Sequence, residues 1–176
     1  TGTDPLKLDA GAGNDYVVGG AGKDTLAGGL GIDKLDFGAE GGTKGISVNL
    51  KSGVAYDSFG SKDSISGFEI VIGTKFNDRV TGSDVSDYLV GGEGNDILKG
   101  GGGQDELYGE NGNDSLYGGD GSDAIYGGAG NDYISGGAGF DTAVYYEDGS
   151  VAGISVNLLK STAIDGFGNT DKLVSI

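Results

Sequence analysis

The apolar residues of the chain recur at a fixed spacing of nine over 10–36 and 73–144. Each is flanked by two mostly polar residues, and a Gly-rich hexamer separates one such triplet from the next. A triplet of this kind is the shortest strand that can bury one face, and the hexamer is typical of a turn. The spacing therefore predicts alternating short strands and tight turns. The apolar residues are Val17, Leu26, Leu35, Val80, Leu89, Leu98, Leu107, Leu116, Ile125, Ile134 and Ala143.

Rows of nine, counted from Ala10, align these residues and show what the turns contain. Eleven rows result, with Gly at the first position in ten of them and at the fourth in nine. Two rows make one coil of a parallel solenoid, so rows 18 apart stack about 4.8 Å from each other. The sixth position is Asp in all eleven rows, and we call this set the Asp column. It comprises Asp15, Asp24, Asp33, Asp78, Asp87, Asp96, Asp105, Asp114, Asp123, Asp132 and Asp141.

The core of such a solenoid is too thin to hold the fold alone. One buried Leu or Ile per row contributes about 1.5–3 kcal/mol, whereas fixing each residue costs about 1–2 kcal/mol of backbone entropy. Stacked carboxylates would repel one another unless a cation lay between them. Calcium suits this position, because its six to eight oxygen ligands tolerate irregular carbonyl geometry better than the octahedron of magnesium does.

Composition narrows the chemistry further. The chain has 40 Gly, one Pro and a formal net charge of −16, which without the repeat would favour disorder. It contains neither Cys nor His, so zinc sites, disulfides and His-dependent catalytic groups are excluded and any metal must be bound by oxygen. The negative charge argues against nucleic acid, and no apolar run is long enough for membrane insertion. Because Met is absent, we expect a fragment of a longer protein.

Seven pairs of column carboxylates lie two rows apart and could each hold one ion. Roughly seven calcium ions would add about +14 to the charge of −16 and so nearly cancel the repulsion that opposes folding. The pairs are Asp15 with Asp33, Asp78 with Asp96, Asp87 with Asp105, Asp96 with Asp114, Asp105 with Asp123, Asp114 with Asp132, and Asp123 with Asp141.

The motif G-G-x-G-x-D-x-U-x, repeated over eleven rows, resembles the RTX (repeats-in-toxin) calcium-binding nonapeptide repeat of secreted bacterial proteins. The resemblance implies an all-β fold, a parallel β-roll or right-handed β-solenoid with two nine-residue rows per coil and non-consensus inserted strands. It further implies that each ion takes the carbonyls of positions two and four plus the Asp of one row. The row stacked on it, two rows later, adds the carbonyls of positions one and three plus its Asp.

Carried over to this chain, the family rule names five complete ligand sets. They are Gly11, Gly13 and Asp15 with Gly28, Leu30 and Asp33; Gly92, Gly94 and Asp96 with Gly109, Asn111 and Asp114; Gly101, Gly103 and Asp105 with Gly118, Asp120 and Asp123; Glu110, Gly112 and Asp114 with Gly127, Ala129 and Asp132; and Gly119, Gly121 and Asp123 with Gly136, Ala138 and Asp141. The rows at 73–90 depart from the motif, with Thr74, Phe76, Ser83 and Val85 where Gly is expected. Sites that need those four carbonyls are therefore in question.

Residues 37–72 interrupt the rows, and a shift of twelve rows aligns this segment with the end of the chain. The sequence GISVNL occurs at 45–50 and again at 153–158. The predicted division is a first roll (1–36), a connector (37–72), a second roll (73–144) and a truncated second connector (145–176). Each connector is interpreted as a longer, calcium-poor coil or a small cap between adjacent rolls.

The first connector contains two stretches of alternating residues that predict half-buried strands. Ile46, Val48 and Leu50 are expected to face inward in one of them, and Phe68, Ile70 and Ile72 in the other. The loops carry four acids that are interpreted as solvated turn residues, the alternative being that they bind an extra ion. These acids are Asp57, Asp63, Asp165 and Asp171.

The predicted function is that of a calcium-binding structural module of a large secreted exoprotein, exported by the type I route and folded by calcium outside the cell. Alternatives are an adhesive or surface-layer module that binds polysaccharide or self-associates, and the non-catalytic C-terminal module of a secreted enzyme. Outward tyrosines, with Tyr108 and Tyr126 stacked, are interpreted as shielding the strands, although a glycan-contacting stripe is the alternative. Catalysis is not expected, because the Asp residues occupy equivalent positions.

Overall fold

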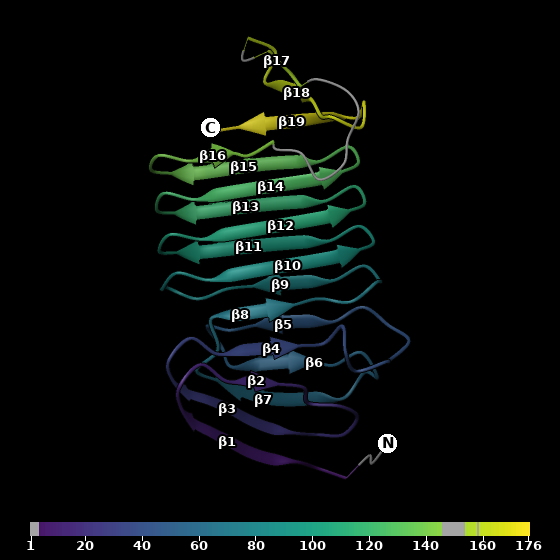
Figure 1. The fold of residues 1–176 in the computed structure, drawn as a ribbon, viewed down its shortest axis with the longest axis vertical. Helices are drawn as coiled ribbons and strands as arrows, with labels where there is room; N and C mark the ends of the chain where they lie inside the picture. Colours follow the sequence, from purple (N-terminus) through teal and green to yellow (C-terminus); the bar gives the residue numbers. More distant parts are fainter. Residues whose placement is uncertain (1–3, 146–153, 158) are drawn as a thin grey trace.

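The structure is a computed structural model that describes residues 4–145, 154–157 and 159–176. Its elements are short strands stacked along one long axis, with the N-terminus and the C-terminal strands at opposite ends (Figure 1). They form two sheets that face each other across the core. The prediction of an all-β, parallel solenoid with about 18 residues per coil is thereby confirmed.

Twelve strands form the first sheet and seven form the second. In spatial order, the first contains β1 (Lys7–Ala12), β3 (Thr25–Leu30), β7 (Lys62–Ser66), β6 (Val54–Tyr56), β5 (Ser47–Asn49), β9 (Arg79–Thr81), β11 (Ile97–Gly102), β13 (Ser115–Asp120), β15 (Tyr133–Ala138), β19 (Thr170–Val174), β18 (Thr162–Ile164) and β17 (Ser155–Asn157). The second contains β16 (Thr142–Ala143), β14 (Ala124–Ala129), β12 (Glu106–Asn111), β10 (Tyr88–Glu93), β8 (Ile70–Ile72), β4 (Lys34–Asp36) and β2 (Tyr16–Val17).

The register of the parallel pairs follows the two-row coil. Leu98 on β11 lies beside Leu116 on β13, and Leu107 on β12 lies beside Ile125 on β14. The apolar residues of the eighth position therefore form a continuous ladder on each side, and all but Ala143 have at most 2% of their surface exposed. Each row thus contributes one side chain to the core, as the sequence pattern predicts.

The first connector is built into both sheets rather than set beside them. Strands β5, β6 and β7 form an antiparallel meander within the twelve-stranded sheet, where β7 pairs with β3 and β5 pairs with β9. Strand β8 lies between β4 and β10 in the other sheet. The connector is therefore a longer coil of the same solenoid. Strands β17, β18 and β19 repeat the meander beside β15. The division of the chain into rolls and connectors stays a prediction.

The predicted inner face of the strand around residue 70 is right for Phe68, which is buried, and wrong for Ile70 and Ile72. Val71 is fully buried, whereas Ile70 and Ile72 are only half-buried. Val71 lies between Leu35 of β4 and Leu89 of β10, so stacking on two core ladders sets the face of this strand. Alternation alone could not decide it within β8, because Ile70, Val71 and Ile72 are all apolar. For the other stretch the prediction holds, because Ile46 and Val48 are buried.

Candidate metal sites between stacked turns

The Asp column forms two ladders, one along each edge where strands follow turns. In all seven predicted pairs, the backbone N–H of one Asp donates to Oδ1 of the Asp two rows later, at 2.7–3.0 Å. The carboxylates are buried beneath the turns, apart from the half-buried Asp15 and Asp141. The structure therefore stacks these pairs as the spacing predicts.

The second carboxylate oxygen of most column residues is buried without a hydrogen-bond partner. This is an unfavourable state for a charged group, and each such oxygen needs an explanation. No Lys or Arg of the described residues neutralises the column, since the ion pairs found there join Lys34 to Asp36 and Lys51 to Asp84. The oxygens concerned are Oδ2 of Asp15, Asp24, Asp33, Asp96, Asp105, Asp114, Asp123 and Asp132.

Burial also makes these carboxyl groups hard to ionise. Desolvation raises the pKa of Asp96 and of Asp132 to about 7, and neighbouring column carboxylates add to both shifts. The same burial raises the pKa of Asp105 and of Asp114 to about 6. If these groups are to be ionised at neutral pH, a positive charge must lie beside them.

Backbone carbonyls of the next turn point at the same unpartnered oxygens. A Cβ placed on Gly100 would overlap both Oδ2 of Asp105 and the carbonyl oxygen of Gly118. Gly109 and Gly118 stand in the same relation to their own row's Asp and to the first-position carbonyl of the row stacked on them. Carboxylate and carbonyl oxygens therefore approach each other at the first position, which only Gly allows.

The second and fourth positions of the consensus turns have left-handed backbone conformations. At Gly101 and Gly103, for example, φ is 117° and 114°. Glu110 occupies the second position of its row and still adopts a φ of 74°, which a side chain disfavours. The turn conformation is therefore maintained even where the sequence departs from Gly.

The oxygens gathered at each consensus turn pair fit a calcium ion. Two Asp side chains and nearby carbonyls supply hard oxygen ligands, and the unpartnered Oδ2 atoms lack any other counter-charge. Within the described residues, no three acidic side chains converge on one point as a metal site. An ion between the turns would accordingly draw on backbone oxygens for most of its ligands.

A sequence model of the RTX calcium-binding nonapeptide repeat matches residues 7–35, 81–116 and 108–143, together just over half of the chain. The chain belongs to this RTX repeat family. Repeats of the family bind calcium and are typical of secreted bacterial proteins. A comparison with curated proteins finds no match to the chain. No helix of the described residues is long and apolar enough to span a membrane.

The two RTX rows that depart from the motif close their turns with hydrogen bonds. The backbone N–H of Thr74 donates to Oδ2 of Asp78, and the Thr74 hydroxyl donates to Oδ1. In the next row, the N–H and hydroxyl of Ser83 donate to Oδ2 of Asp87. None of the four substituted residues adopts a positive φ. The first half of a consensus site is therefore not formed in either row.

Three acids of the connectors extend the Asp column. The nine-residue spacing does not predict these positions. The backbone N–H of Asp24 donates to Oδ1 of Asp63, and that of Asp132 donates to Oδ1 of Asp171. The N–H of Asp33 donates to Oε2 of Glu69. The D-x-apolar-x pattern around Asp63 and Asp171 was a usable signal, but their larger separation from the preceding column Asp concealed it. That Glu69 takes such a position was not predictable from the motif.

The interpretation of the four connector acids as solvated is wrong. Asp57, Asp63, Asp165 and Asp171 each have at most 2% of their surface exposed. Asp57 and Asp165 accept two backbone N–H groups each within their own loops, while Asp63 and Asp171 stack under column residues. Whether any of them binds an ion stays a prediction.

A ladder of asparagines at the fifth position supports the turns on one edge. Oδ1 of Asn77 accepts the backbone N–H of Asn95. In the same way, Oδ1 of Asn95 accepts the N–H of Asn113, and Oδ1 of Asn113 accepts the N–H of Asn131. Asn131 in turn accepts the N–H of Thr170. These bonds join five successive coils without involving the Asp column.

Tyr88, Tyr108 and Tyr126 stack along the outer face of the seven-stranded sheet, as predicted for Tyr108 and Tyr126. The rings of Tyr108 and Tyr126 are 4.2 Å apart and nearly parallel, and the Tyr88 ring is 4.9 Å from that of Tyr108. Tyr108 and Tyr126 thus cover one ring face of each other. Sugar rings bind to exposed aromatic faces, so this stacking favours the shielding interpretation over the glycan-contacting stripe.

Proposed function

We propose that the chain is a calcium-dependent folding module of a large secreted exoprotein. The observation that supports it is the row of buried, unpartnered Asp Oδ2 atoms, which approach carbonyl oxygens of the next turn. Without a cation these oxygens oppose folding, and with one they become ligands. Calcium binding and formation of the roll are then one process.

The proposal assigns five ions to the consensus turn pairs, two fewer than the number of Asp pairs. Each of the five pairs has positive φ angles at the second and fourth positions of its first turn. The pairs Asp78 with Asp96 and Asp87 with Asp105 lack this conformation, and Thr74 and Ser83 occupy the carboxylate oxygens instead. One consensus ion lies in the first roll and four in the second.

Coupling of folding to calcium binding would keep the chain unfolded until it has been exported. In a cytosol with little calcium, the charge of −16 and the entropy of 40 Gly keep the chain extended and suited to type I secretion. Outside the cell, calcium near the 10⁻⁴–10⁻³ M affinity typical of extracellular modules would fold it. The long repeat of twelve rows supports a large repetitive surface protein as parent rather than an enzyme. The proposal places no catalysis in these residues.

Circular dichroism on the calcium-free chain, followed by calcium addition, tests the proposal. We expect little strand signal in EGTA and a cooperative gain of strand signal on adding calcium, with magnesium much less effective. Strand signal that EGTA leaves unchanged would contradict coupled folding and favour a constitutive solenoid. Retention of the calcium-loaded chain on polysaccharide, or its assembly into larger species, would favour the adhesive alternative.

A further inference from the structure

Glu69 occupies a position of the Asp column across the first connector. Its Oε2 accepts the N–H of Asp33 at 3.0 Å, as Oδ1 of Asp33 accepts the N–H of Asp15 in the preceding coil. The N–H of Ile70, the next residue, donates to the Asp33 carbonyl, as that of Lys34 does to the Asp15 carbonyl. A glutamate four rows after Asp33 thus continues the ladder where the motif has ended.

The turn before Asp33 has the features of the first turn of a consensus pair. Gly29 and Gly31 have φ angles of 118° and 138°, and Asp33 is fully buried with no partner for its Oδ2. A Cβ on Gly28 would overlap both this Oδ2 and the carbonyl oxygen of Gly67. Gly67 therefore presents its carbonyl where a consensus row presents that of its first Gly.

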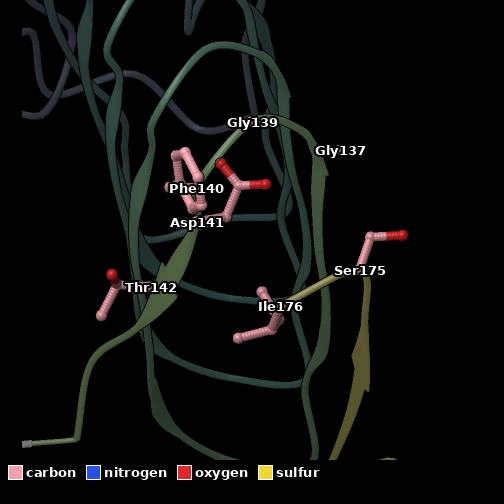
Figure 2. Close-up of a pocket in the computed structure, with 7 residues that line it drawn as sticks. All are labelled: Gly137, Gly139, Phe140, Asp141, Thr142, Ser175 and Ile176. Atoms are coloured by element: carbon pink, nitrogen blue, oxygen red, sulfur yellow. The ribbon is translucent and has the colours of Figure 1, made fainter.

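The same arrangement occurs a second time, twelve rows later. A Cβ on Gly136 would overlap Oδ2 of Asp141 and the carbonyl oxygen of Ser175. Figure 2 shows Asp141 beside the turn of Gly137 and Gly139, with Ser175 on the neighbouring segment that directly follows β19. These residues line a pocket of about 360 Å³. Ser175 adopts a φ of 50° and Gly67 one of 64°. A serine held in this disfavoured conformation indicates that the direction of its carbonyl matters.

We propose that Asp33, Glu69 and the carbonyls of Gly29, Gly31 and Gly67 bind a calcium ion across the connector. The two carboxylates supply the negative charge of a column pair, and none of the described ion pairs neutralises either of them. The mixture of carboxylate and carbonyl oxygens favours calcium over magnesium. The ion would tie the first roll to strand β8 and so make both rolls one calcium-dependent body.

The chain provides a matched control for Glu69. Glu106 is an exposed acid on β12 whose side chain accepts the Tyr108 hydroxyl on the outer face, and replacing it with Gln changes the charge by the same amount without removing a proposed ligand. Glu69→Gln keeps the size of the side chain and an acceptor for the Asp33 N–H. The number of bound calcium ions is counted by native mass spectrometry on the full chain at saturating calcium, after circular dichroism has shown that each variant is folded.

We expect Glu69→Gln to bind one ion fewer than the wild type, and Glu106→Gln to bind the same number. Glu69→Asp, which restores the residue type of the column, should retain the ion. Asp33→Asn should lose two ions, because Asp33 would serve both the Asp15 site and this one. An unchanged count in Glu69→Gln, or a loss of only one ion in Asp33→Asn, would overturn the inference.

This inference rests on the proposed function, in which calcium binds between the nonapeptide turns. The ion count distinguishes a failure of the connector site from a failure of the proposed function. A wild-type chain that binds no calcium would contradict the proposed function as a whole. A wild-type chain that binds at least five ions, with the same count in Glu69→Gln, would contradict the connector site alone.

Discussion

Seven residues of the Asp column use their two carboxylate oxygens differently, namely Asp24, Asp33, Asp96, Asp105, Asp114, Asp123 and Asp132. Oδ1 accepts a backbone N–H from the coil before it, which Asn could also do, whereas the buried Oδ2 has no protein partner. The first oxygen therefore supports the fold, and in the proposed function the second oxygen binds the ion. Substitution by Asn therefore separates the two roles at a single residue.

Asp114 is the best position for this test, because it belongs to two consensus pairs, with Asp96 and with Asp132. We expect Asp114→Asn to remove or weaken two ions and to raise the calcium concentration at the folding midpoint at least tenfold, which corresponds to about 1.4 kcal/mol. Calcium titration followed by circular dichroism measures it. Asp4→Asn, at an exposed residue that belongs to no proposed ligand set, should leave the midpoint unchanged. Equal shifts in both variants would count against the assignment.

Protons should compete with calcium for the same carboxylates. Burial raises the pKa of Asp96 and Asp132 to about 7 in the calcium-free fold, well above the usual value of about 4. Their contribution to the stability of that fold is therefore present at low pH and lost as the pH rises through about 7. Without calcium, the chain should accordingly show more strand signal at pH 5 than at pH 8.

Low pH should favour the calcium-free fold but should oppose calcium binding. An ion must displace the protons that these carboxyl groups hold, so the calcium needed for folding should increase as the pH falls from 8 to 5. Calcium titrations at several pH values, with chelator-free buffers depleted of calcium, measure both effects. A midpoint that does not vary with pH would show that the buried carboxyl groups are ionised before calcium binds.

The sequence predicts the Asp column because a nine-residue spacing fixes which side chains share an edge of a solenoid. It does not predict Glu69, since the connector changes the spacing from two rows to four and the residue type from Asp to Glu. It also places Asp63 and Asp171 in solvent, because the burial of a loop acid depends on which coil stacks above it. Periodicity identifies the repeated contacts but not those made by insertions.

At the scale of elements, the chain contains two kinds of turn. Consensus turns keep positive φ angles and leave Asp Oδ2 without a partner, whereas in the turns at 73–90 Thr74 donates to both oxygens of Asp78 and Ser83 donates to Oδ2 of Asp87. The substituted residues could be recognised from the sequence as departures from the motif. Their role as hydrogen-bonding caps required the structure, because Ser and Thr are tolerated in many conformations.

The cap at Thr74 should contribute to stability whether or not calcium is bound. Thr74→Ala removes the hydroxyl bond to Asp78, and we expect the free energy of unfolding to fall by about 1–2 kcal/mol at saturating calcium. The number of bound ions should not change. Thr81→Ala, on the outer face of β9, is the control, and urea unfolding provides the measurement. A loss of calcium together with stability would instead make Thr74 part of a metal site.

For the whole molecule, the proposed function relates the composition to a calcium-free extended state and the fold to a calcium-bound state. A charge of −16 with 40 Gly favours an extended chain, and the thin core of one apolar residue per row cannot offset this alone. The charge is concentrated where the coils stack. In the proposed function, calcium would therefore act at the consensus turns of both rolls, and not where side chains cap the turns or where antiparallel strands replace the repeat.

This distribution predicts the order in which the molecule loses structure as calcium is lowered. The segment 91–144 holds four of the five proposed consensus ions, whereas the turns at 73–90 and the meander of β5, β6 and β7 are closed by hydrogen bonds within the chain. In hydrogen–deuterium exchange at subsaturating calcium, amides of 91–144 should exchange first and those of 43–90 last. If 91–144 stayed protected longest, the ions would not be the main support of the second roll, and the asparagine ladder that joins its coils would be the leading alternative.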